Sequence, residues 1–220
     1  MARTKLKRFE DLKERQNVLE AAMPLGQDLQ GKWNTAIFER DQPITVEMGC
    51  GKGEYTIGLA KRFPKKNHVG VDVKGDRLWV GSTQAIEENL NNAVFLRAQI
   101  QQIDAFFEIN EVDEIWITFP DPRPKDRDIK RRLTSPRYLA MYKQILTPDG
   151  TVNFKTDNKG LFEYTLETVQ ERSDIGQLEY TFDLYESDLQ ALTHGIKTNF
   201  EEKYLALDTP IKFMQFQFIK

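Results

Sequence analysis

The segment Ile44-Thr45-Val46-Glu47-Met48-Gly49-Cys50-Gly51-Lys52-Gly53 joins a short apolar run to a turn that contains three glycines. The run has the composition of a buried strand, and residues 54–63 follow with helical spacing up to Pro64. Glycines in such a turn permit positive φ angles and a close approach of the backbone to a ligand. Ligands of open α/β sheets bind beyond the carboxyl ends of the strands, so the segment predicts a ligand loop at that edge of a sheet.

Strand and helix patterns alternate through the rest of the chain. Further strands are expected at 68–73, 93–96, 112–119 and 151–155, and further helices at 77–90, 134–146 and 158–172. The short links between them favour parallel βαβ units. Two more strand-like runs, 179–185 and 211–219, could close the sheet as an antiparallel pair. We therefore expect an α/β fold with a doubly wound, mostly parallel sheet and an antiparallel C-terminal strand pair.

The chain divides by pattern near residue 40. Residues 1–40 look like an appendage made of a basic tail, a polar helical run to about Ala22 and a connection that contains Gly and Pro. Residues 41–220 are expected to form a single domain, since the alternating pattern is confined to them.

Composition restricts the environment and the partners. Of the 220 residues, 40% are hydrophobic and 30% are charged, as in an ordinary globular protein. No stretch approaches the apolar length that spans a bilayer. A single cysteine, Cys50, excludes an internal disulfide, and with two histidines it cannot build the usual zinc sites. The composition predicts a cytoplasmic protein without a membrane partner or a bound metal, and it leaves open whether the protein is a monomer or a homodimer.

Positive charge is concentrated in two places on a chain whose formal net charge is −3. Residues 1–8 carry four basic side chains and no acidic one, and residues 123–132 carry six basic side chains against two acidic ones. Basic runs are more often solvated faces than RNA sites, but the second run adjoins the predicted ligand edge. That position favours contact of residues 123–132 with a nucleic acid, whereas residues 1–8 could be a phosphate-binding arm or a disordered tail.

Two carboxylates indicate which ligand the glycine loop takes. Glu47 directly precedes the loop, and Asp72 ends the next strand, 25 residues after Glu47. Dinucleotide-binding loops need Gly or Ala where this chain has Glu54, a poor neighbour for a pyrophosphate. Glu47 suits a cationic ligand, and Asp72 can accept hydrogen bonds from ribose hydroxyls. S-adenosylmethionine, with its ammonium and sulfonium groups, fits this pattern better than NAD. A solvated Glu47 and an Asp72 that only caps a turn are the alternatives.

The strand at 112–119 ends in Phe119-Pro120-Asp121-Pro122-Arg123-Pro124-Lys125. Three prolines stiffen this loop and fix the directions of Asp121 and Lys125 over the same edge of the sheet. A rigid surface connection would explain the prolines, but not an acid placed between an apolar strand and a basic run.

These segments and others further along resemble the bacterial tRNA (guanine-N7-)-methyltransferases of the TrmB type, over nearly the whole chain from Lys32 to Tyr204. The matching motifs are Gly31-Lys32-Trp33-Asn34, Glu47–Gly53, Val69–Asp72, Phe119–Leu133 with its Lys130-Arg131-Arg132, Phe154-Lys155-Thr156-Asp157-Asn158 and Thr198-Asn199-Phe200-Glu201-Glu202-Lys203. The resemblance implies a Rossmann-like class I methyltransferase. It would transfer a methyl group from S-adenosyl-L-methionine to N7 of guanine-46 in the variable loop of tRNA.

The resemblance also implies roles for individual residues. The cofactor site would comprise Glu47, Gly49, Gly51, Gly53, Asp72, Gln99 and Asp121. Substrate contacts would come from Lys125, Asp157, Thr198, Asn199, Phe200 and Glu201, and RNA contacts from Arg127, Lys130, Arg131 and Arg132. Two positions depart from the family pattern: Gln99 stands where Asp is most common, and Arg123 stands where Trp is usual. An amide oxygen can still accept from an adenine amino group, and a guanidinium plane can replace an aromatic ring.

The chemistry suits these residues because guanine N7 carries a free lone pair at neutral pH and needs no general base. The methylated purine is positively charged, and a carboxylate stabilises such charge, so Asp121 is the candidate catalytic residue. Asp157 or Glu201 would contact the base edge or the ribose. Three alternatives are a non-catalytic RNA-binding module, a DNA amino-methyltransferase and a nicotinamide dehydrogenase. The intact acid and glycine pattern disfavours the RNA-binding module. The DNA enzyme is disfavoured because the chain lacks a Pro-Pro-aromatic sequence, and the dehydrogenase because of Glu54.

Overall fold

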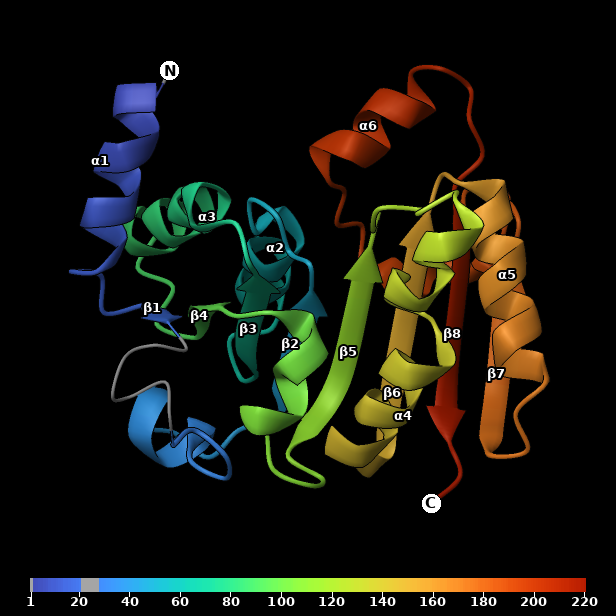
Figure 1. Cartoon of the computed structure of the whole chain (residues 1–220), viewed down its shortest axis with the longest axis horizontal. Coiled ribbons are helices and arrows are strands. Elements are labelled where there is room, and N and C mark those ends of the chain that lie inside the picture. The colour runs from blue at the N-terminus through green and yellow to red at the C-terminus, as the bar shows by residue number, and fades with distance from the viewer. Residues whose placement is uncertain (1, 21–27) are drawn as a thin grey trace.

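An eight-stranded sheet runs through the molecule in the order β1-β4-β3-β2-β5-β6-β8-β7 (Figure 1). This computed structural model describes residues 2–20 and 28–220, with the side chains of residues 7–20 and 28–220. The strands are β1 (Val18–Glu20), β2 (Ile44–Met48), β3 (Asn67–Asp72), β4 (Ala93–Arg97), β5 (Val112–Thr118), β6 (Leu146–Thr156), β7 (Ile175–Thr181) and β8 (Lys212–Phe218). Strands β1 to β6 pair in parallel, and β8 pairs antiparallel with both β6 and β7. The expected mostly parallel sheet with an antiparallel C-terminal pair is confirmed.

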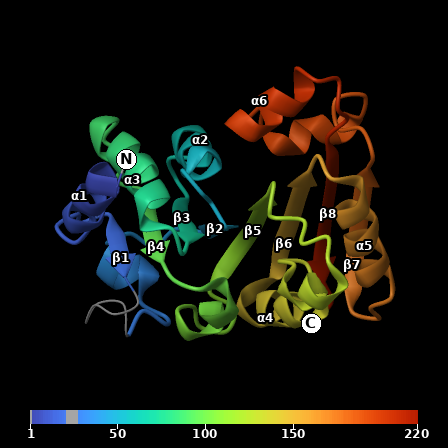
Figure 2. The ribbon, with the colours of Figure 1, turned by 45° about the horizontal axis from the view of Figure 1, so that its top comes forward.

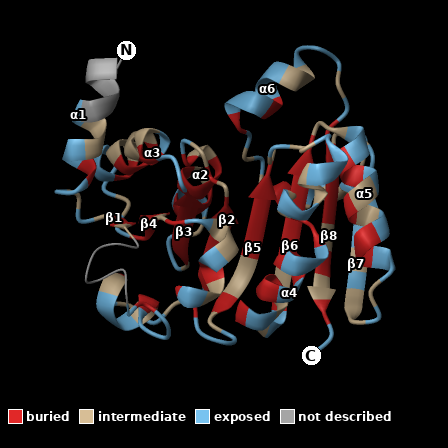
Figure 3. Ribbon diagram, in the orientation of Figure 1, coloured by how far each residue is buried: buried red, intermediate tan, exposed pale blue. Residues whose placement is uncertain are grey.

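Helices cover both faces of this sheet. The α-helices of the described residues are α1 (Ala2–Leu12), α2 (Glu54–Arg62), α3 (Gly75–Glu87), α4 (Pro136–Ile145), α5 (Lys159–Gln170) and α6 (Asn199–Leu205), with short helical segments η2 (Trp33–Ile37), η3 (Ile100–Ala105), η4 (Asp126–Arg131) and η5 (Asp188–Thr193). Successive strand residues point to opposite faces. In β4, Val94 and Leu96 therefore join the core that α4 and α5 cover, whereas Phe95 packs with residues of α2 and α3. The central parallel strands β2, β3 and β4 are buried on both sides, as a parallel sheet requires, whereas the edge strand β7 has no buried residue (Figure 3).

Most expected elements lie within a few residues of their predicted bounds, and β2 matches them at both ends. Two strands differ more. Strand β7 begins and ends four residues before the predicted range 179–185. Strand β6 begins at Leu146, five residues early, and its register with β5 shifts between Val112 and Glu114 to accommodate the additional residues.

The described residues among the first forty lie against the rest of the chain, and the predicted division near residue 40 stays a prediction. The helix expected to reach about Ala22 ends at Leu12, and β1 follows as an edge strand paired with β4. Residues 21 and 22 lie outside the described part of the chain. Helix α1 packs on α3 (Figure 2). Trp33 is fully buried, stacks on Phe107 at 4.8 Å, and donates from Nε1 to the Phe106 carbonyl at 2.7 Å.

No helix within residues 2–20 and 28–220 has the length and apolar character needed to cross a membrane.

Candidate active site

The glycine loop connects β2 to α2 at the carboxyl edge of the sheet. Gly49, Gly51 and Gly53 have φ angles of +79°, +57° and +74°, in the region that favours glycine. A Cβ at Gly53 would also lie 2.5 Å from the Phe95 ring. Both the positive φ angle and this close contact therefore disfavour any larger residue at this position. A Cβ at Gly51 would meet nothing within 4 Å, which shows that the loop borders open space there.

Glu47 lies beneath this loop with 2% of its surface exposed. Its carboxylate accepts hydrogen bonds from Thr56 N at 2.8 Å, Thr56 Oγ1 at 2.5 Å and Thr118 Oγ1 at 2.7 Å. Burial raises the pKa of Glu47 from 4.5 to about 7, although these hydrogen bonds favour the ionised form. Near neutral pH the group therefore shifts readily between its two states, and a cation in the cavity would favour the carboxylate.

Asp72, at the end of β3, is largely buried and holds two backbone segments in place. Its Oδ2 accepts from Gly51 N at 3.0 Å, and its Oδ1 accepts from Lys74 N at 2.8 Å. The second bond is the turn cap that the sequence allows, and the first ties β3 to the glycine loop. Each carboxylate oxygen can accept a further hydrogen bond, so Asp72 still has acceptor capacity toward the cavity that it lines.

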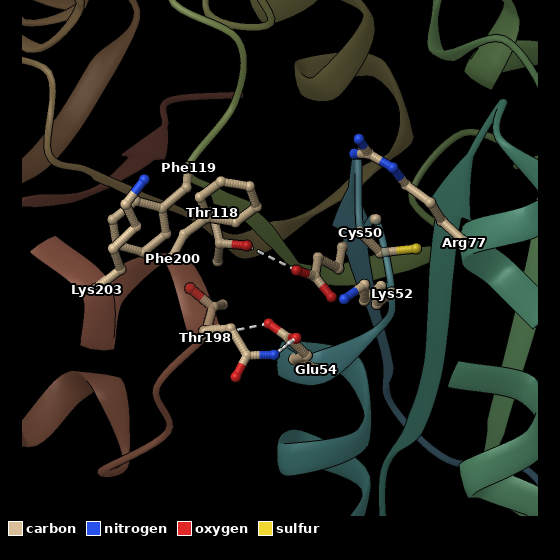
Figure 4. Close-up of a pocket in the computed structure, with 13 residues that line it drawn as sticks. Cys50, Lys52, Glu54, Arg77, Thr118, Phe119, Thr198, Phe200 and Lys203 are labelled. Carbon is tan, nitrogen blue, oxygen red and sulfur yellow. Dashed lines mark hydrogen bonds between the residues drawn. The ribbon is translucent and has the colours of Figure 1, made fainter. Parts of the chain in front are cut away.

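Two adjoining cavities open above the strand ends. The first, of about 450 Å³, is lined by Glu47, Gly49, Cys50, Gly51, Lys52, Glu54, Arg77, Thr118, Phe119, Thr198, Asn199, Phe200 and Lys203 (Figure 4). The second, of about 480 Å³, includes Asp72, Lys74, Ala98, Gln99, Ile100, Asp121, Arg123 and Tyr138 in its lining. Gly49, Arg77 and Phe119 belong to both linings, so the two cavities adjoin each other, and together they are called the cleft.

Helix α6 forms one wall of the first cavity and is fixed at its N-terminus. Thr198 and Glu201 form a capping box, with Thr198 Oγ1 accepting from Glu201 N at 3.1 Å. Asn199 N donates to Glu54 Oε2 at 2.9 Å, and the Asn199 side chain donates to the other oxygen of the same carboxylate. The dashed lines that end at Glu54 in Figure 4 mark this contact between α6 and α2, and the one from Thr118 marks its bond to Glu47. Asn199 and Phe200 are exposed on this wall, where a substrate can reach them.

Glu201, a predicted substrate contact, has a fully buried side chain in this structure, and its contact with the substrate stays a prediction. Glu201 pairs with Lys155 of β6 at 2.7 Å, and Tyr185 donates its hydroxyl to the same carboxylate oxygen at 2.7 Å. Burial lowers the pKa of Lys155, and the neighbouring Glu201 opposes that change. No role for Lys155 was predicted from the sequence. A lysine directly after Val152-Asn153-Phe154, inside an expected strand, could have indicated a buried charge there.

The Pro-Asp-Pro loop positions Asp121 at the mouth of the second cavity. Asp121 is exposed and pairs with Arg123, accepting from its backbone N at 3.1 Å and lying 3.2 Å from its Nε. Arg132 donates to the carbonyls of Pro122 at 3.2 Å and Arg123 at 3.2 Å, and its guanidinium lies over the Tyr164 ring. Arg132 thus supports the loop within the protein, and its predicted contact with RNA stays a prediction.

The remaining predicted residues lie in different places. Gln99 is exposed at the start of η3 and lines the second cavity. Lys125, Arg127, Lys130 and Arg131 are exposed on or beside η4, and Arg131 pairs with Asp128 at 3.2 Å. Lys125 and Asp157 line neither cavity, so their substrate contacts stay predictions. Within the described part of the chain, no three potential ligands cluster as a metal site.

Comparison with known proteins identifies the family. Residues 41–214 match a family model described as a putative methyltransferase. A tRNA (guanine-N(7)-)-methyltransferase of Cytophaga hutchinsonii is 42% identical over 220 residues, which cover 100% of this chain and 99% of that relative. The enzyme of the same name from Christiangramia forsetii is 40% identical over 222 residues, covering 98% of each chain. The chain belongs to the tRNA (guanine-N(7)-)-methyltransferase family.

Solved structures show that the chain shares its overall fold with other methyltransferases. An antibiotic-related methyltransferase aligns with a TM-score of 0.60 and 19% identity over 86% of this chain and 94% of its own. The 16S rRNA methyltransferase KamB aligns with a TM-score of 0.62 and 13% identity over 88% and 95%. As a member of its family the chain is an S-adenosylmethionine-dependent methyltransferase. Its cleft fits that cofactor, since a buried carboxylate of raised pKa faces the first cavity and a second carboxylate with free acceptor capacity lines the next.

Proposed function

We propose that this chain methylates N7 of guanine-46 in the variable loop of tRNA. The observation that carries the proposal is the cleft in which Glu47, Asp72 and Asp121 stand at or just beyond the carboxyl ends of β2, β3 and β5. Support comes from relatives that share the full length of the chain and are named for methylation of guanine N7 in tRNA. We also infer a cytoplasmic location, because the substrate is tRNA and the single cysteine suits a reducing compartment.

We expect the two cavities to bind different parts of S-adenosylmethionine. When bound, this cofactor supplies a methyl group activated by a sulfonium. Glu47 faces the first cavity and suits the cationic end of the cofactor, while the acceptor capacity of Asp72 suits ribose hydroxyls. Gln99 lines the second cavity and can accept from the adenine amino group through its amide oxygen.

Asp121 is the candidate catalytic residue. Methylation leaves positive charge on the purine, and a carboxylate positioned near the base stabilises that charge as it develops. The present partner of Asp121 is Arg123, and 61% of the Asp121 side chain and 36% of the Arg123 side chain are exposed. An exposed ion pair of this kind contributes little to stability. Asp121 can therefore leave Arg123 and pair with a charged base at a small cost in free energy. Guanine N7 loses no proton, and the remaining requirement is alignment of the base with the methyl group.

The basic surface beside Asp121 provides the means to hold RNA. Lys125, Arg127, Lys130 and Arg131 project from η4 or its start, on the loop that carries Asp121. Lysine and arginine side chains that neutralise phosphates supply most of the sequence-independent affinity for nucleic acid. Binding through η4 would bring a tRNA backbone next to the mouth of the second cavity.

The proposal is tested with Asp121→Ala and a matched control, Asp126→Ala. Both residues are exposed acids on the same loop, but Asp126 lines neither cavity. Asp121→Ala should lower the turnover of a tRNA transcript by about 10²-fold or more, while its thermal unfolding stays unchanged. Asp126→Ala should keep near-normal turnover. Near-normal turnover in Asp121→Ala would refute the catalytic assignment.

A further inference from the structure

We propose that Phe119 and Phe200 form a base-binding subsite that holds the methylated, positively charged guanine more tightly than guanine itself. The inference rests on the proposed function, because it takes guanine N7 as the methyl acceptor. Both phenylalanines line the first cavity, one from the end of β5 and one from α6 (Figure 4).

Phe200 is an exposed aromatic residue on a fixed support. Its side chain is 55% exposed, and it lies in the first turn of α6. The capping box, the buried pair of Lys155 with Glu201 and the bonds from Asn199 to Glu54 hold that turn in place. A large apolar ring that is exposed in a cavity contributes little to the core. When its backbone is also held in place, such a ring is well placed to contact a ligand.

Phe119 enters the same cavity in an unusual backbone conformation. Its φ angle is +47°, a region that bulky residues adopt rarely and that is found most often at functional sites. The Phe119 N–H donates to the Lys155 carbonyl at 2.8 Å, which anchors the strained residue to β6. Phe119 lines both cavities, so the residue lies between the first and the second.

Neither ring is occupied by another aromatic residue. Among the described residues, the ring pairs include neither Phe119 nor Phe200, and no cation lies over either ring. Phe119 is partly buried and packs on the cluster that contains Trp116 and Phe213, whereas Phe200 is 55% exposed. The part of each side chain that lines the first cavity can stack on a planar base, as aromatic side chains do in nucleic-acid-binding proteins. Lys203 lines the same cavity, where its ammonium group can pair with the phosphate of that nucleotide.

The reaction changes the charge of the stacked base. The N7 lone pair forms the new N–C bond, the S–C electron pair returns to sulfur, and no proton moves. The purine gains the positive charge that the sulfonium loses. An aromatic face attracts a cation more strongly than a neutral ring, so the subsite favours the charged purine. Because that charge is already developing at the transition state, the same two rings also lower the barrier.

The test compares two nucleotides as ligands by calorimetry, with S-adenosylhomocysteine present at saturation. The probes are 7-methylguanosine 5′-monophosphate and guanosine 5′-monophosphate at pH 6, where the methylated ring keeps its charge. The wild-type protein should bind the methylated nucleotide about tenfold more tightly. Phe200→Leu should reduce this preference to about twofold or less, and Phe200→Trp should retain it, since Trp is the best cation–π partner. Phe119→Leu should act like Phe200→Leu.

Phe182→Leu is the matched control, because Phe182 is 41% exposed, packs edge-to-face against Phe162 and lines neither cavity. It should leave the preference unchanged. Equal binding of the two nucleotides by the wild type, no measurable binding of either, or an unchanged preference in Phe200→Leu would overturn the inference. If 7-methylguanosine nevertheless forms in tRNA, the proposed function stands while the subsite does not. If none forms in any tRNA, the proposed function itself has failed.

Discussion

The buried carboxyl group of Glu47 predicts that cofactor affinity depends on pH. In the ligand-free protein its pKa is about 7, because burial outweighs three hydrogen bonds that favour the ionised form. A cationic ligand in the first cavity pairs with the ionised form alone. The protonated fraction must therefore release its proton before the ligand binds, and the affinity falls as the pH falls below about 7.

The size of the effect follows from that pKa. The apparent Kd equals the intrinsic Kd multiplied by the factor 1 + 10^(pKa − pH). With a pKa of about 7, this factor falls from about 11 at pH 6.0 to about 1.3 at pH 7.5. S-adenosylmethionine should thus bind about eightfold more weakly at pH 6.0 than at pH 7.5.

Isothermal titration calorimetry at the two pH values measures this ratio directly. Glu47→Gln keeps the size of the side chain and removes its titration, so this variant should bind more weakly at pH 7.5 and show a ratio near one. The reasoning would be refuted by a wild-type ratio near one, or by a Glu47→Gln variant that keeps the eightfold change.

Two further predictions concern the buried ion pair and the basic surface. Lys155→Met leaves the fully buried Glu201 without its partner, and it should lower the free energy of unfolding in urea by about 3 to 5 kcal/mol. The double variant Lys155→Met, Glu201→Gln should lose clearly less, and an equal loss would contradict the ion-pair argument. Charge reversal of Lys130 and Arg131 should weaken tRNA binding in filter assays and reduce the slope of log K against log salt by about 2. An unchanged slope would show that η4 does not contact phosphates.

The parts of the fold that follow local rules could be predicted from sequence. The run from Ile44 to Gly53 combines an apolar strand with glycines whose positive φ angles the turn requires, and the structure places β2 within the predicted bounds. Strand β1 could not be found in the same way, because Val18–Glu20 is only three residues long. Its pairing with β4 is what makes it a strand, and that partner lies more than seventy residues further along.

The candidate site was predictable where it follows from strand ends. Glu47, Asp72 and Asp121 come directly at or after the ends of neighbouring parallel strands, and such ends meet at one edge of the sheet. The burial of Glu201 could not be inferred, because it depends on Lys155 reaching the N-terminus of α6 from β6. The positive φ of Phe119 could not be inferred either, since this residue is held by a hydrogen bond to the Lys155 carbonyl of another strand.

The most direct test of the proposed activity is nucleoside analysis of tRNA after incubation with the purified protein and S-adenosylmethionine labelled in its methyl group. The label should appear as 7-methylguanosine, at position 46 of the variable loop, and a transcript with adenosine at that position should acquire none there. Label in another nucleoside, or no label in any tRNA while the protein binds S-adenosylmethionine, would contradict the assignment.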